Sequence, residues 1–555
     1  MVRPASDPPS APTPSTGSTA QLDLRRLPWA RPLGTDYAFN FAGVADFFAG
    51  DPSQEADWAD AIRRAQQHPR RRAELAAIIS AQQTRRAAPD AARAAGARLA
   101  DANAVAVVTG QQAGLFGGPL YTLLKALSAL QLAAQVQARH GVPTVAVFWV
   151  DSEDHDWDEV RTCTVLDAAM TPVTVALPER HGDAVPVARV TLDHSVDAAI
   201  ATLEQTLPAT DFTAGVLADL RASYVPGVGM SEAFGRWLER VLGPHGLVVY
   251  DASDPAAKPL AAPVFVHELA HPGVTTALAT ATGARLAARG YHAQVHPTSD
   301  STALFSLAGG RRSIRCHGDQ FAMGDMVVDA AEVRQEASAH PEQFSPNVLL
   351  RPLVQDTLFP TICYVGGPSE LAYLGQLKDV YAHFGVPMPL VHPRGSATLL
   401  DAGARRFLTR SGLPLEAFQS QDESALNQWL ESQIPATVEA AFSHAERAIA
   451  ESMEAVIAAM PSVDPTLEST SRSTLTRMQQ DLRSLHGKMI TAAKRRDETL
   501  RRQFTRTRAV TFPAGTPQER TIGVIGFLNL YGPALVDRLL TDVLPSLGHH
   551  TLVFL

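Results

Sequence analysis

Two stretches of the sequence decide the fold of this chain: VAVVTGQQAGLFGGPLYTLLKALSAL at residues 105–130 and PTVAVFWVDSEDHDWDEV at residues 143–160. Each opens with a β-branched apolar run, which predicts a buried strand of a parallel sheet. Each run then breaks into a polar loop, and the first loop leads into an amphipathic helix. Because open α/β sheets bind ligands at the carboxyl ends of their strands, we expect the functional site between these two loops.

Length and composition predict several globular modules. The chain has 555 residues, more than one hydrophobic core usually contains, and 45% of them are apolar. Its unbroken apolar runs, such as residues 145–150, are far shorter than the roughly 18 residues that span a bilayer. Residues 1–20 are rich in proline, serine and threonine. This composition predicts a disordered leader rather than a signal peptide.

Charge and cysteine content indicate which partners and which cellular compartment to expect. The net charge is −9, and the only basic run in the first 430 residues is residues 70–72, so we expect no nucleic-acid partner. Cys163, Cys316 and Cys363 are far apart and form no CxxC pair. This spacing indicates no disulfide framework and fits a reducing, cytoplasmic location.

The alternation of strand-like and helical segments predicts an α/β core interrupted by two insertions. Short β-like runs break the alternation in both insertions, and residues 291–296 of the core are expected to form a strand. The predicted segments are a leader (1–20), the core in three parts (21–161, 231–299 and 347–430), a first insertion (162–230), a second insertion (300–346), an antiparallel coiled coil (431–508) and an α/β tail (509–555).

The C-terminal part of the chain has the pattern of a helical hairpin. Apolar residues recur at helical spacing over residues 438–460, and a turn with two prolines follows. Over residues 475–492 the apolar spacing is 3-4-3-4-3, which is a heptad seam. The first arm is acidic and the second basic, so we expect antiparallel pairing and a dimer surface. The basic arm is otherwise a solvated face, or a face that binds phosphate or RNA.

The loop after the first strand combines glycines with polar side chains. Glycines there let backbone N–H groups approach a phosphate or a carboxylate, and the helix N-terminus adds positive potential. Neither GxGxxG nor GxxxxGK[ST] is present, so a plain tight turn is the alternative. Lys125, one helical turn after Tyr121, could neutralise a phosphate. The candidate substrate- or nucleotide-binding residues here are Gly110, Gln111, Gln112, Gly114, Gly117, Gly118, Tyr121 and Lys125.

The loop after the second strand is dense in ionisable groups. Glu153, Asp154, His155 and Asp156 follow that strand almost directly. A histidine beside carboxylates can act as a general base or as a metal ligand, so these four are the candidate catalytic residues. The alternative is an acidic cap at the N-terminus of the next helix.

A third polar group surrounds a strand predicted at residues 362–365. Arg351 and Arg394 could each bind a carboxylate in bidentate fashion, although a structural ion pair is equally consistent with the sequence. Further candidate binding residues in this group are Asn347, Gln355, Asp356, Gly366, Gly367, Glu370 and Tyr373.

One match to a zinc-binding motif is not expected to form a metal site. Residues 267–271, HELAH, match the HExxH pattern of zinc proteases. Pro272 follows at once, and in a continued helix its ring would clash with the carbonyl of Glu268. No well-placed third ligand follows in the sequence, so we expect no metal site.

Five separated motifs give the chain a resemblance to a known family. They are TGQQAGLFGGPLYTLLKA (109–126), VFWVDSEDHDWDEV (147–160), SPNVLLRPLVQDTLFPTICYVGGPSELAYLGQL (345–377), PMPLVHPR (387–394) and PAGTPQER (513–520). The chain resembles the bacillithiol biosynthesis cysteine-adding enzymes, a family of cysteine ligases. The resemblance implies a Rossmann-like core of the class I synthetase and nucleotidyltransferase type, two connecting-peptide insertions and a coiled coil used for homodimerisation. It also implies addition of cysteine to glucosaminyl-malate, the last step to the thiol bacillithiol.

The sequence departs from class I aminoacyl-tRNA synthetases at both of their signatures. Residues 115–120, where HxGH would fall, contain no histidine, and no two lysines are three residues apart as KMSKS requires. An amide between cysteine and an amino sugar still needs an activated carboxylate. We therefore expect ATP or another nucleotide as the energy source, with or without Mg²⁺.

These expectations combine into one mechanistic hypothesis. The glycine loop with Lys125 holds phosphate or carboxylate, His155 or Asp156 accepts the proton of the attacking amine, and Arg351 or Arg394 binds the malate carboxylates. Two alternatives remain open: a metal-dependent nucleotidyltransferase or hydrolase that uses the acidic loop, and a nucleotide-binding scaffold protein.

Overall fold

The computed structural model describes residues 18–180, 185–298, 300–433, 436–496 and 498–555, which form two compact units. The larger unit comprises Thr16–Leu399 with Gln518–Val553, and the smaller comprises Leu400–Pro517 with Phe554–Leu555. Most of the expected leader lies outside the described residues, but strand β1 (Thr19–Asp23) begins before its expected end at residue 20. Among the described helices, none combines the length and apolar character of a membrane span.

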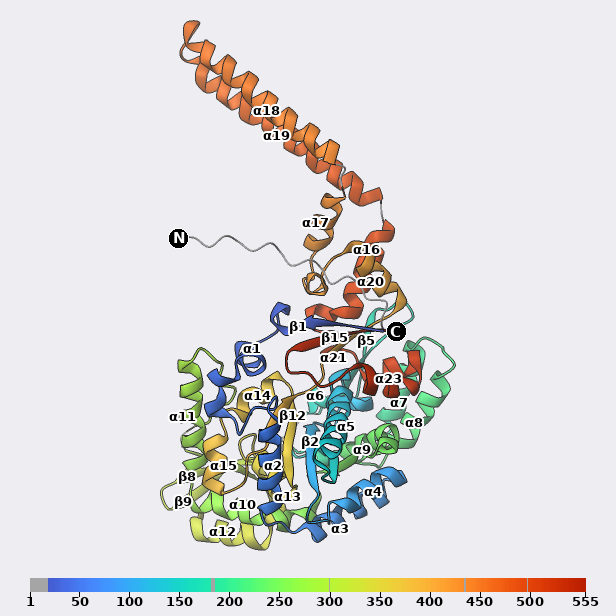
Figure 1. Ribbon diagram of the computed structural model, residues 1–555, viewed down its shortest axis with the longest axis vertical. Helices are drawn as coiled ribbons and strands as arrows, with labels where there is room; N and C mark the ends of the chain where they lie inside the picture. The colour runs from blue at the N-terminus through green and yellow to red at the C-terminus, as the bar shows by residue number, and fades with distance from the viewer. Residues whose placement is uncertain (1–17, 181–184, 299, 434–435, 497) are drawn as a thin grey trace. The chain divides into compact units, whose positions relative to one another are not determined.

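A five-stranded parallel sheet forms the centre of the larger unit (Figure 1). Strands β2 and β3 pair from Val105 opposite Thr144 to Gln111 opposite Val150, so both end at the same edge of the sheet. This arrangement confirms the predicted Rossmann-like core. The order of the strands is β13 (Leu390–Pro393), β12 (Thr361–Gly366), β2 (Val105–Gln111), β3 (Thr144–Val150) and β6 (Val248–Asp251).

Side chains of the central strands alternate between two faces, and helices cover both faces. Trp149 packs into the core that contains α3 (Arg72–Arg85). Phe148 points the other way, and its ring centroid lies 5.9 Å from that of Phe234 on α9 (Met230–Leu242). All 7 residues of β3 are buried, which explains why this stretch of sequence is continuously apolar.

Helix α5 (Leu120–His140) connects β2 to β3. It begins after Pro119 and ends at Gly141, whose φ of 67° gives the left-handed conformation common at helix C-termini. Its buried residues include the expected leucine stripe and also Lys125, the one charged side chain among them. Further helices of the larger unit are α1 (Pro32–Phe39), α2 (Glu55–Gln67), α4 (Asp90–Arg98), α6 (Trp157–Val160), α10 (Lys258–Ala270), α11 (Val274–Ala288), α13 (Arg351–Leu358), α14 (Pro368–Leu374), α15 (Lys378–Phe384), α21 (Gln518–Thr521), α22 (Val524–Tyr531) and α23 (Ala534–Asp542).

Each expected insertion contains a small antiparallel β structure. The first has the hairpin of β4 (Thr162–Leu166) and β5 (Pro172–Ala176), followed by α7 (Ser195–Thr206) and α8 (Thr213–Ser223). The second has a five-stranded sheet in the order β10 (Met326–Asp329), β9 (Gln320–Met323), β8 (Arg312–His317), β7 (Ser301–Ser306) and β11 (Phe344–Pro346), with α12 (Ala330–Ala339) between β10 and β11. In the tail, β15 (His549–Phe554) pairs with β1 and with β14 (Ala397–Leu400).

The sequence predicts a strand at residues 291–296, and this prediction is wrong, because the structure has neither helix nor strand there. The backbone groups of this segment bond instead to the buried side-chain amide of Gln376. Its Oε1 accepts the N–H groups of Gln294 and Val295 at 3.0 Å each, and its Nε2 donates to the Val295 carbonyl at 3.0 Å. A single side chain from far along the sequence thus takes the place of a neighbouring strand.

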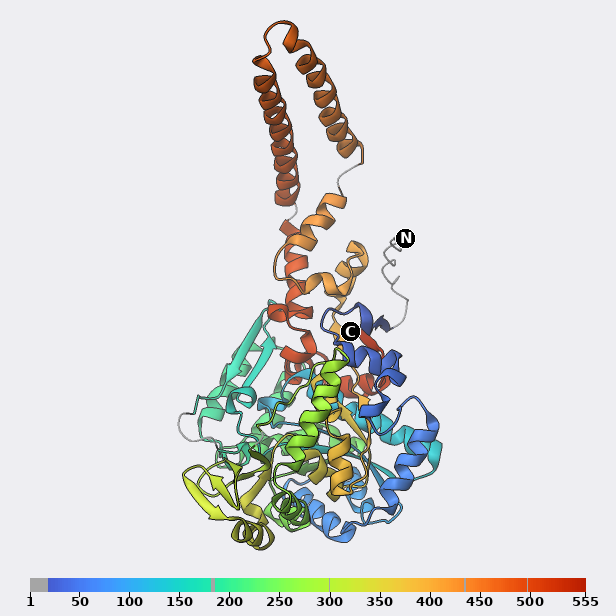
Figure 2. The same ribbon diagram turned by 90° about the vertical axis from the view of Figure 1, so that its left-hand side faces the viewer.

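The smaller unit contains a long helical hairpin (Figure 2). Cross-arm contacts join Arg483 to Glu446 at 3.1 Å and His486 to Glu439 at 2.9 Å. These pairs confirm the predicted antiparallel pairing of an acidic arm with a basic arm. The helices of this unit are α16 (Ala402–Ser411), α17 (Ser424–Ser432), α18 (Ala436–Ala459) and α19 (Leu467–Arg496), which form the hairpin, and α20 (Glu498–Thr511), which packs against α16.

Candidate functional site

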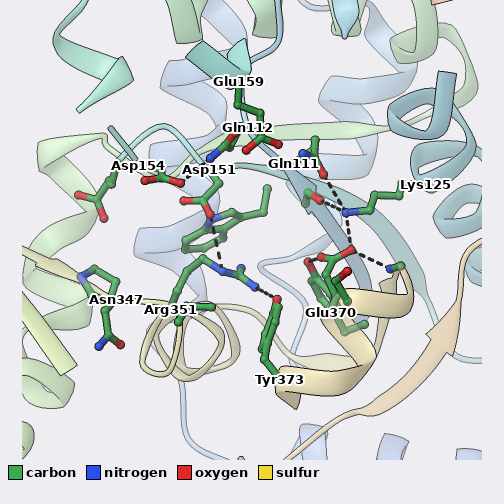
Figure 3. Close-up of a pocket in the computed structure, with 18 of the residues that line it drawn as sticks. Gln111, Gln112, Lys125, Asp151, Asp154, Glu159, Asn347, Arg351, Glu370 and Tyr373 are labelled. Atoms are coloured by element: carbon green, nitrogen blue, oxygen red, sulfur yellow. Dashed lines mark hydrogen bonds and ion pairs between the residues drawn. The ribbon is translucent and has the colours of Figure 1, made fainter. Parts of the chain in front are cut away.

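A cavity of about 620 Å³ lies at the carboxyl ends of β2, β3 and β12. The loops after β2 and β3 and the beginning of α14 form its walls, and residues 305, 311 and 346–348 of the second insertion and its end complete them (Figure 3). This is the edge where open α/β sheets bind ligands, as the sequence predicts. Thirteen of the predicted site residues line the cavity: Gly110, Gln111, Gln112, Tyr121, Lys125, Glu153, Asp154, Asn347, Arg351, Gly367, Glu370, Tyr373 and Arg394.

The later part of the glycine loop packs against the protein and does not line this cavity. The backbone N–H of Gly117 donates to the hydroxyl of Tyr224 at 3.2 Å, and that hydroxyl donates to the Gly114 carbonyl at 3.1 Å. Gly117 has a φ of 93°, and a Cβ there would lie 2.3 Å from the Trp237 ring. Gly114, Gly117 and Gly118 therefore form a tight packed turn, the alternative that the sequence left open.

Lys125 lies in the cavity wall with all three of its N–H donors engaged. Its Nζ lies 2.5 Å from Glu370 Oε2, 2.8 Å from the Gly110 carbonyl and 2.9 Å from Gln111 Oε1 (Figure 3). Burial lowers the pKa of Lys125, and burial would raise that of Glu370, but the lysine charge and the Tyr364 hydroxyl hold the glutamate pKa below its usual value. Lys125 thus ties β2 to the start of α14 and keeps no proton for a phosphate.

Arg394 also has an internal partner. Its Nη1 and Nη2 donate to the carboxylate of Glu519 at 3.0 and 2.7 Å, and both side chains are buried. Glu519 lies in the PAGTPQER stretch, more than a hundred residues further along the chain. Of the two alternatives that the sequence left open for Arg394, the structure therefore shows the internal ion pair.

The predicted acidic loop divides into buried, lining and exposed members. Glu153 is buried against the ammonium of Lys258, which also donates to the Phe344 carbonyl at 3.0 Å. Asp154 lines the cavity and accepts a hydrogen bond from the side-chain amide of Gln112. His155 and Asp156 are exposed and do not line the cavity, and Asp156 caps α6 by accepting the Glu159 N–H at 3.1 Å.

Three further predicted residues lie behind the cavity wall. Gln355 Oε1 accepts from Arg351 at 3.1 Å, and its Nε2 donates to the buried Asp356 carboxylate at 2.9 Å. Tyr381 also donates to Asp356, at 2.5 Å. The Gly366 carbonyl accepts the backbone N–H of Arg394 at 2.9 Å. These contacts hold α13 and the end of β12 in place beneath the site.

Asp151 is one of the acidic groups that line the cavity, together with Glu153, Asp154 and Glu159. It is the first residue after β3, its side chain is 31% exposed, and its Oδ2 lies 3.8 Å from Arg351 Nε (Figure 3). Burial, together with the nearby carboxylates of Asp154 and Glu153, raises the pKa of Asp151 to about 6. The sequence placed Asp151 in the acidic loop but did not single it out, although its position directly after a buried strand was the available signal.

Three cavity-lining residues also carry a buried polar atom that makes no hydrogen bond with the described part of the chain. Among the described residues, Arg311 Nε, Gln112 Oε1 and Trp149 Nε1 are buried and make no hydrogen bond, although all three residues line the cavity. Arg311 lies over the Phe305 ring at 3.8 Å, in the turn between β7 and β8. No motif in the sequence indicated that this turn reaches the core.

Two family models together cover almost the whole chain. "Bacillithiol biosynthesis BshC, N-terminal Rossmann-like domain" matches residues 19–395, and "Bacillithiol biosynthesis BshC, C-terminal coiled-coil domain" matches residues 397–555. The chain belongs to the BshC family. This finding confirms the resemblance that the five sequence motifs suggested.

Individual BshC relatives match over most of their length. A protein of Salinibacter ruber is 34% identical over 91% of this chain and 93% of its own, and one of Symbiobacterium thermophilum is 33% identical over 91% and 96%. A third, from Chlorobaculum tepidum, is 32% identical over 80% of this chain and 81% of its own. All three bear the name "Putative cysteine ligase BshC".

Proposed function

We propose that this chain is the cysteine ligase of bacillithiol biosynthesis, which forms an amide between cysteine and the amino group of glucosaminyl-malate. Membership of the BshC family and the names of its relatives support this reaction. The observation that carries the proposal at the level of residues is the cavity at the sheet edge, which combines Asp151 with the guanidinium groups of Arg311 and Arg351.

Asp151 is the proton acceptor in this proposal. An amine attacks a carboxyl carbon only after it has lost a proton, so the reaction needs a base next to the amine. With a pKa of about 6, Asp151 is ionised at neutral pH and is a stronger base than an ordinary aspartate. His155 and Asp156, the bases favoured by the sequence, lie outside the cavity lining, which supports the transfer of this role to Asp151.

The malate carboxylates are proposed to bind Arg351 and Arg311. Arg351 donates to the Tyr373 hydroxyl at 3.0 Å and to Gln355, and these contacts fix its plane toward the cavity. Arg311 lines the same cavity, and its Nη1 lies 2.9 Å from His155 Nδ1. Two fixed guanidinium groups suit two carboxylates, whereas Arg394 is already held by Glu519.

An ATP-type donor is retained as the proposed energy source, because a free carboxylate does not form an amide without activation. The phosphate cradle predicted from the glycine loop and Lys125 does not fit that role, since Gly117 and Lys125 donate to protein groups. Asp154, which lines the same cavity, offers carboxylate oxygens of the type that Mg²⁺ takes. No step of the mechanism is assigned to a particular nucleotide contact.

A cytoplasmic homodimer formed through the α18–α19 hairpin is the proposed assembly. The exposed fractions of Met478 and Leu485 on the α19 seam are 39% and 56%. Apolar seam positions of α19 that α18 leaves uncovered favour a further helical partner. The hairpin of a second copy presents the same pattern.

The test uses purified full-length protein with cysteine, glucosaminyl-malate, ATP and Mg²⁺, and detects the product by mass. The proposal predicts a product with the mass of bacillithiol, formed only when all the substrates are present. A nucleotidyltransferase or hydrolase would consume the nucleotide without forming an amide, and a scaffold protein would bind it without turnover. Either result would overturn the proposal.

A further inference from the structure

Three histidine side chains meet on the surface of the larger unit, away from the cavity. His267 lies in the last turn of α10, His271 is the residue after that helix, and His383 lies in the last turn of α15. One nitrogen of each ring lies within 4.8 Å of one nitrogen of both others, the only group of this kind among the described residues. The sequence showed the first two in HELAH without a third ligand, and the fold supplies His383 from 116 residues beyond His267.

The separation of the nitrogens matches the ligand spacing of a metal ion. Nε2 of His267 lies 3.2 Å from Nε2 of His383. In a tetrahedral zinc site, Zn–N bonds of about 2.0–2.1 Å place two nitrogens about 3.3 Å apart. Imidazole nitrogens suit zinc and neighbouring transition metals, whereas Mg²⁺ and Ca²⁺ prefer oxygen.

The surroundings orient the rings for such an ion. Nδ1 of His271 lies 3.0 Å from the His267 carbonyl, so its N–H donates there and its Nε2 keeps a lone pair. The Phe384 ring packs 4.7 Å from the His267 ring and shields one side. Both α10 and α15 end at this point, where the carbonyl groups of helix C-termini favour a cation.

The expected clash with Pro272 does not arise, because α10 ends at Ala270 before the proline. The geometry nevertheless excludes the protease chemistry of HExxH. Glu268 is buried, its Oε1 accepts the Ala303 N–H at 2.7 Å and its Oε2 accepts from the Thr275 hydroxyl. It cannot reach a metal-bound water as a general base, so a metal here serves structure rather than hydrolysis.

We propose that His267, His271 and His383 bind one Zn²⁺ ion, with water as the fourth ligand, and that the ion fastens α10 to α15. His271 is exposed and the other two are half-buried, which leaves room for that water. The joint matters to the cavity, because α10 carries Lys258, the partner of Glu153, and α15 follows α14, which carries Glu370 and Tyr373. The proposal does not depend on the ligase reaction.

The test titrates tag-free, metal-stripped full-length protein with Zn²⁺ in competition with a chromophoric chelator. Wild type should bind one equivalent, and His383→Ala should weaken that binding about tenfold or more. His292→Ala is the matched control, since His292 and His296 have the same i, i+4 spacing but belong to no three-ligand group within the part of the chain that the structure describes. Equal affinity in wild type and His383→Ala, or no binding by wild type, would overturn the site.

A second measurement addresses folding of the variants. Zn²⁺ should raise the Tm of wild type and of His292→Ala, and should leave the Tm of His383→Ala and of His383→Asn unchanged. Far-UV circular dichroism without metal shows whether each variant is folded. An equal rise in Tm in folded His383→Asn and in wild type would contradict the proposed ligand set.

Discussion

The loops that follow β2 and β3 leave the same edge of the same sheet but differ in how they face the cavity. At the end of β2, Gln111 and Gln112 line the cavity before the chain turns inward, and Gly117 packs against Trp237 and Tyr224. After β3, Asp151 enters the cavity at once, while the loop then turns outward and exposes Asp156.

The difference shows that a residue's distance from the strand end, more than its type, decides whether it reaches the cavity. Glycines after a strand suggest a phosphate cradle, but here their backbone groups serve a packed turn. A dense acidic run suggests several equivalent bases, but burial raises the pKa of Asp151 to about 6 in the cavity wall, whereas Asp156 is exposed and caps α6. The residue that first leaves a buried strand is therefore the stronger candidate in each loop.

Removal of the lysine that fixes the first loop should give the largest loss of stability. Lys125→Met leaves the half-buried Glu370 carboxylate without its cationic partner, and we expect the free energy of unfolding to fall by about 3 kcal/mol. Urea denaturation measures the loss. Lys378→Met is the control, since its ammonium bonds to one carbonyl, that of Ala45, and should cost about 1 kcal/mol. Equal losses would show that Lys125 is not a structural tie.

A methyl group in the glycine turn should have an effect of nearly the same size. Gly117→Ala forces a positive φ on alanine and places its Cβ against Trp237, so we expect a loss of about 3 kcal/mol. Gly141→Ala also has a positive φ but meets nothing within 4 Å, and should cost about 1 kcal/mol. Thermal or urea unfolding compares the two variants. A stable Gly117→Ala protein that has lost substrate binding would instead support a ligand cradle.

The pH dependence of turnover tests whether Asp151, in the second loop, acts as the base. Because burial raises the pKa of Asp151 to about 6, nearly all of this carboxyl group is ionised at pH 7, and the ionised fraction is lost as the pH falls through 6. Between pH 7 and pH 5, kcat/KM should fall about tenfold. Steady-state kinetics across this range measures the change. A profile that is flat down to pH 5 would exclude Asp151 as the base.

The parallel sheet, the two insertions and the hairpin were predictable because periodicity is local information. The β3 run is apolar throughout since the strand is buried on both faces, and the α18 and α19 arms carry complementary charges. The prediction of a strand at residues 291–296 was wrong because the side chain of Gln376, far along the chain, accepts the backbone N–H groups of this segment.

The position of the candidate site could be predicted from the sequence, but only some of its residues could. Thirteen predicted residues line the cavity because strand ends are recognisable from sequence. The partners that decide their roles are distant: Glu519 for Arg394, Lys258 for Glu153, and the β7–β8 turn for Arg311. Pairing across such separations depends on the fold, and no local pattern reveals it.

The central claim is that Asp151, and not the exposed end of its loop, accepts the proton of the amine. The most direct measurement compares the rate of amide formation, followed by mass, in Asp151→Asn and His155→Ala. We expect a rate about 1,000-fold below wild type for Asp151→Asn, and a rate within about threefold of wild type for His155→Ala. A nearly normal rate in Asp151→Asn beside an inactive His155→Ala would contradict this claim.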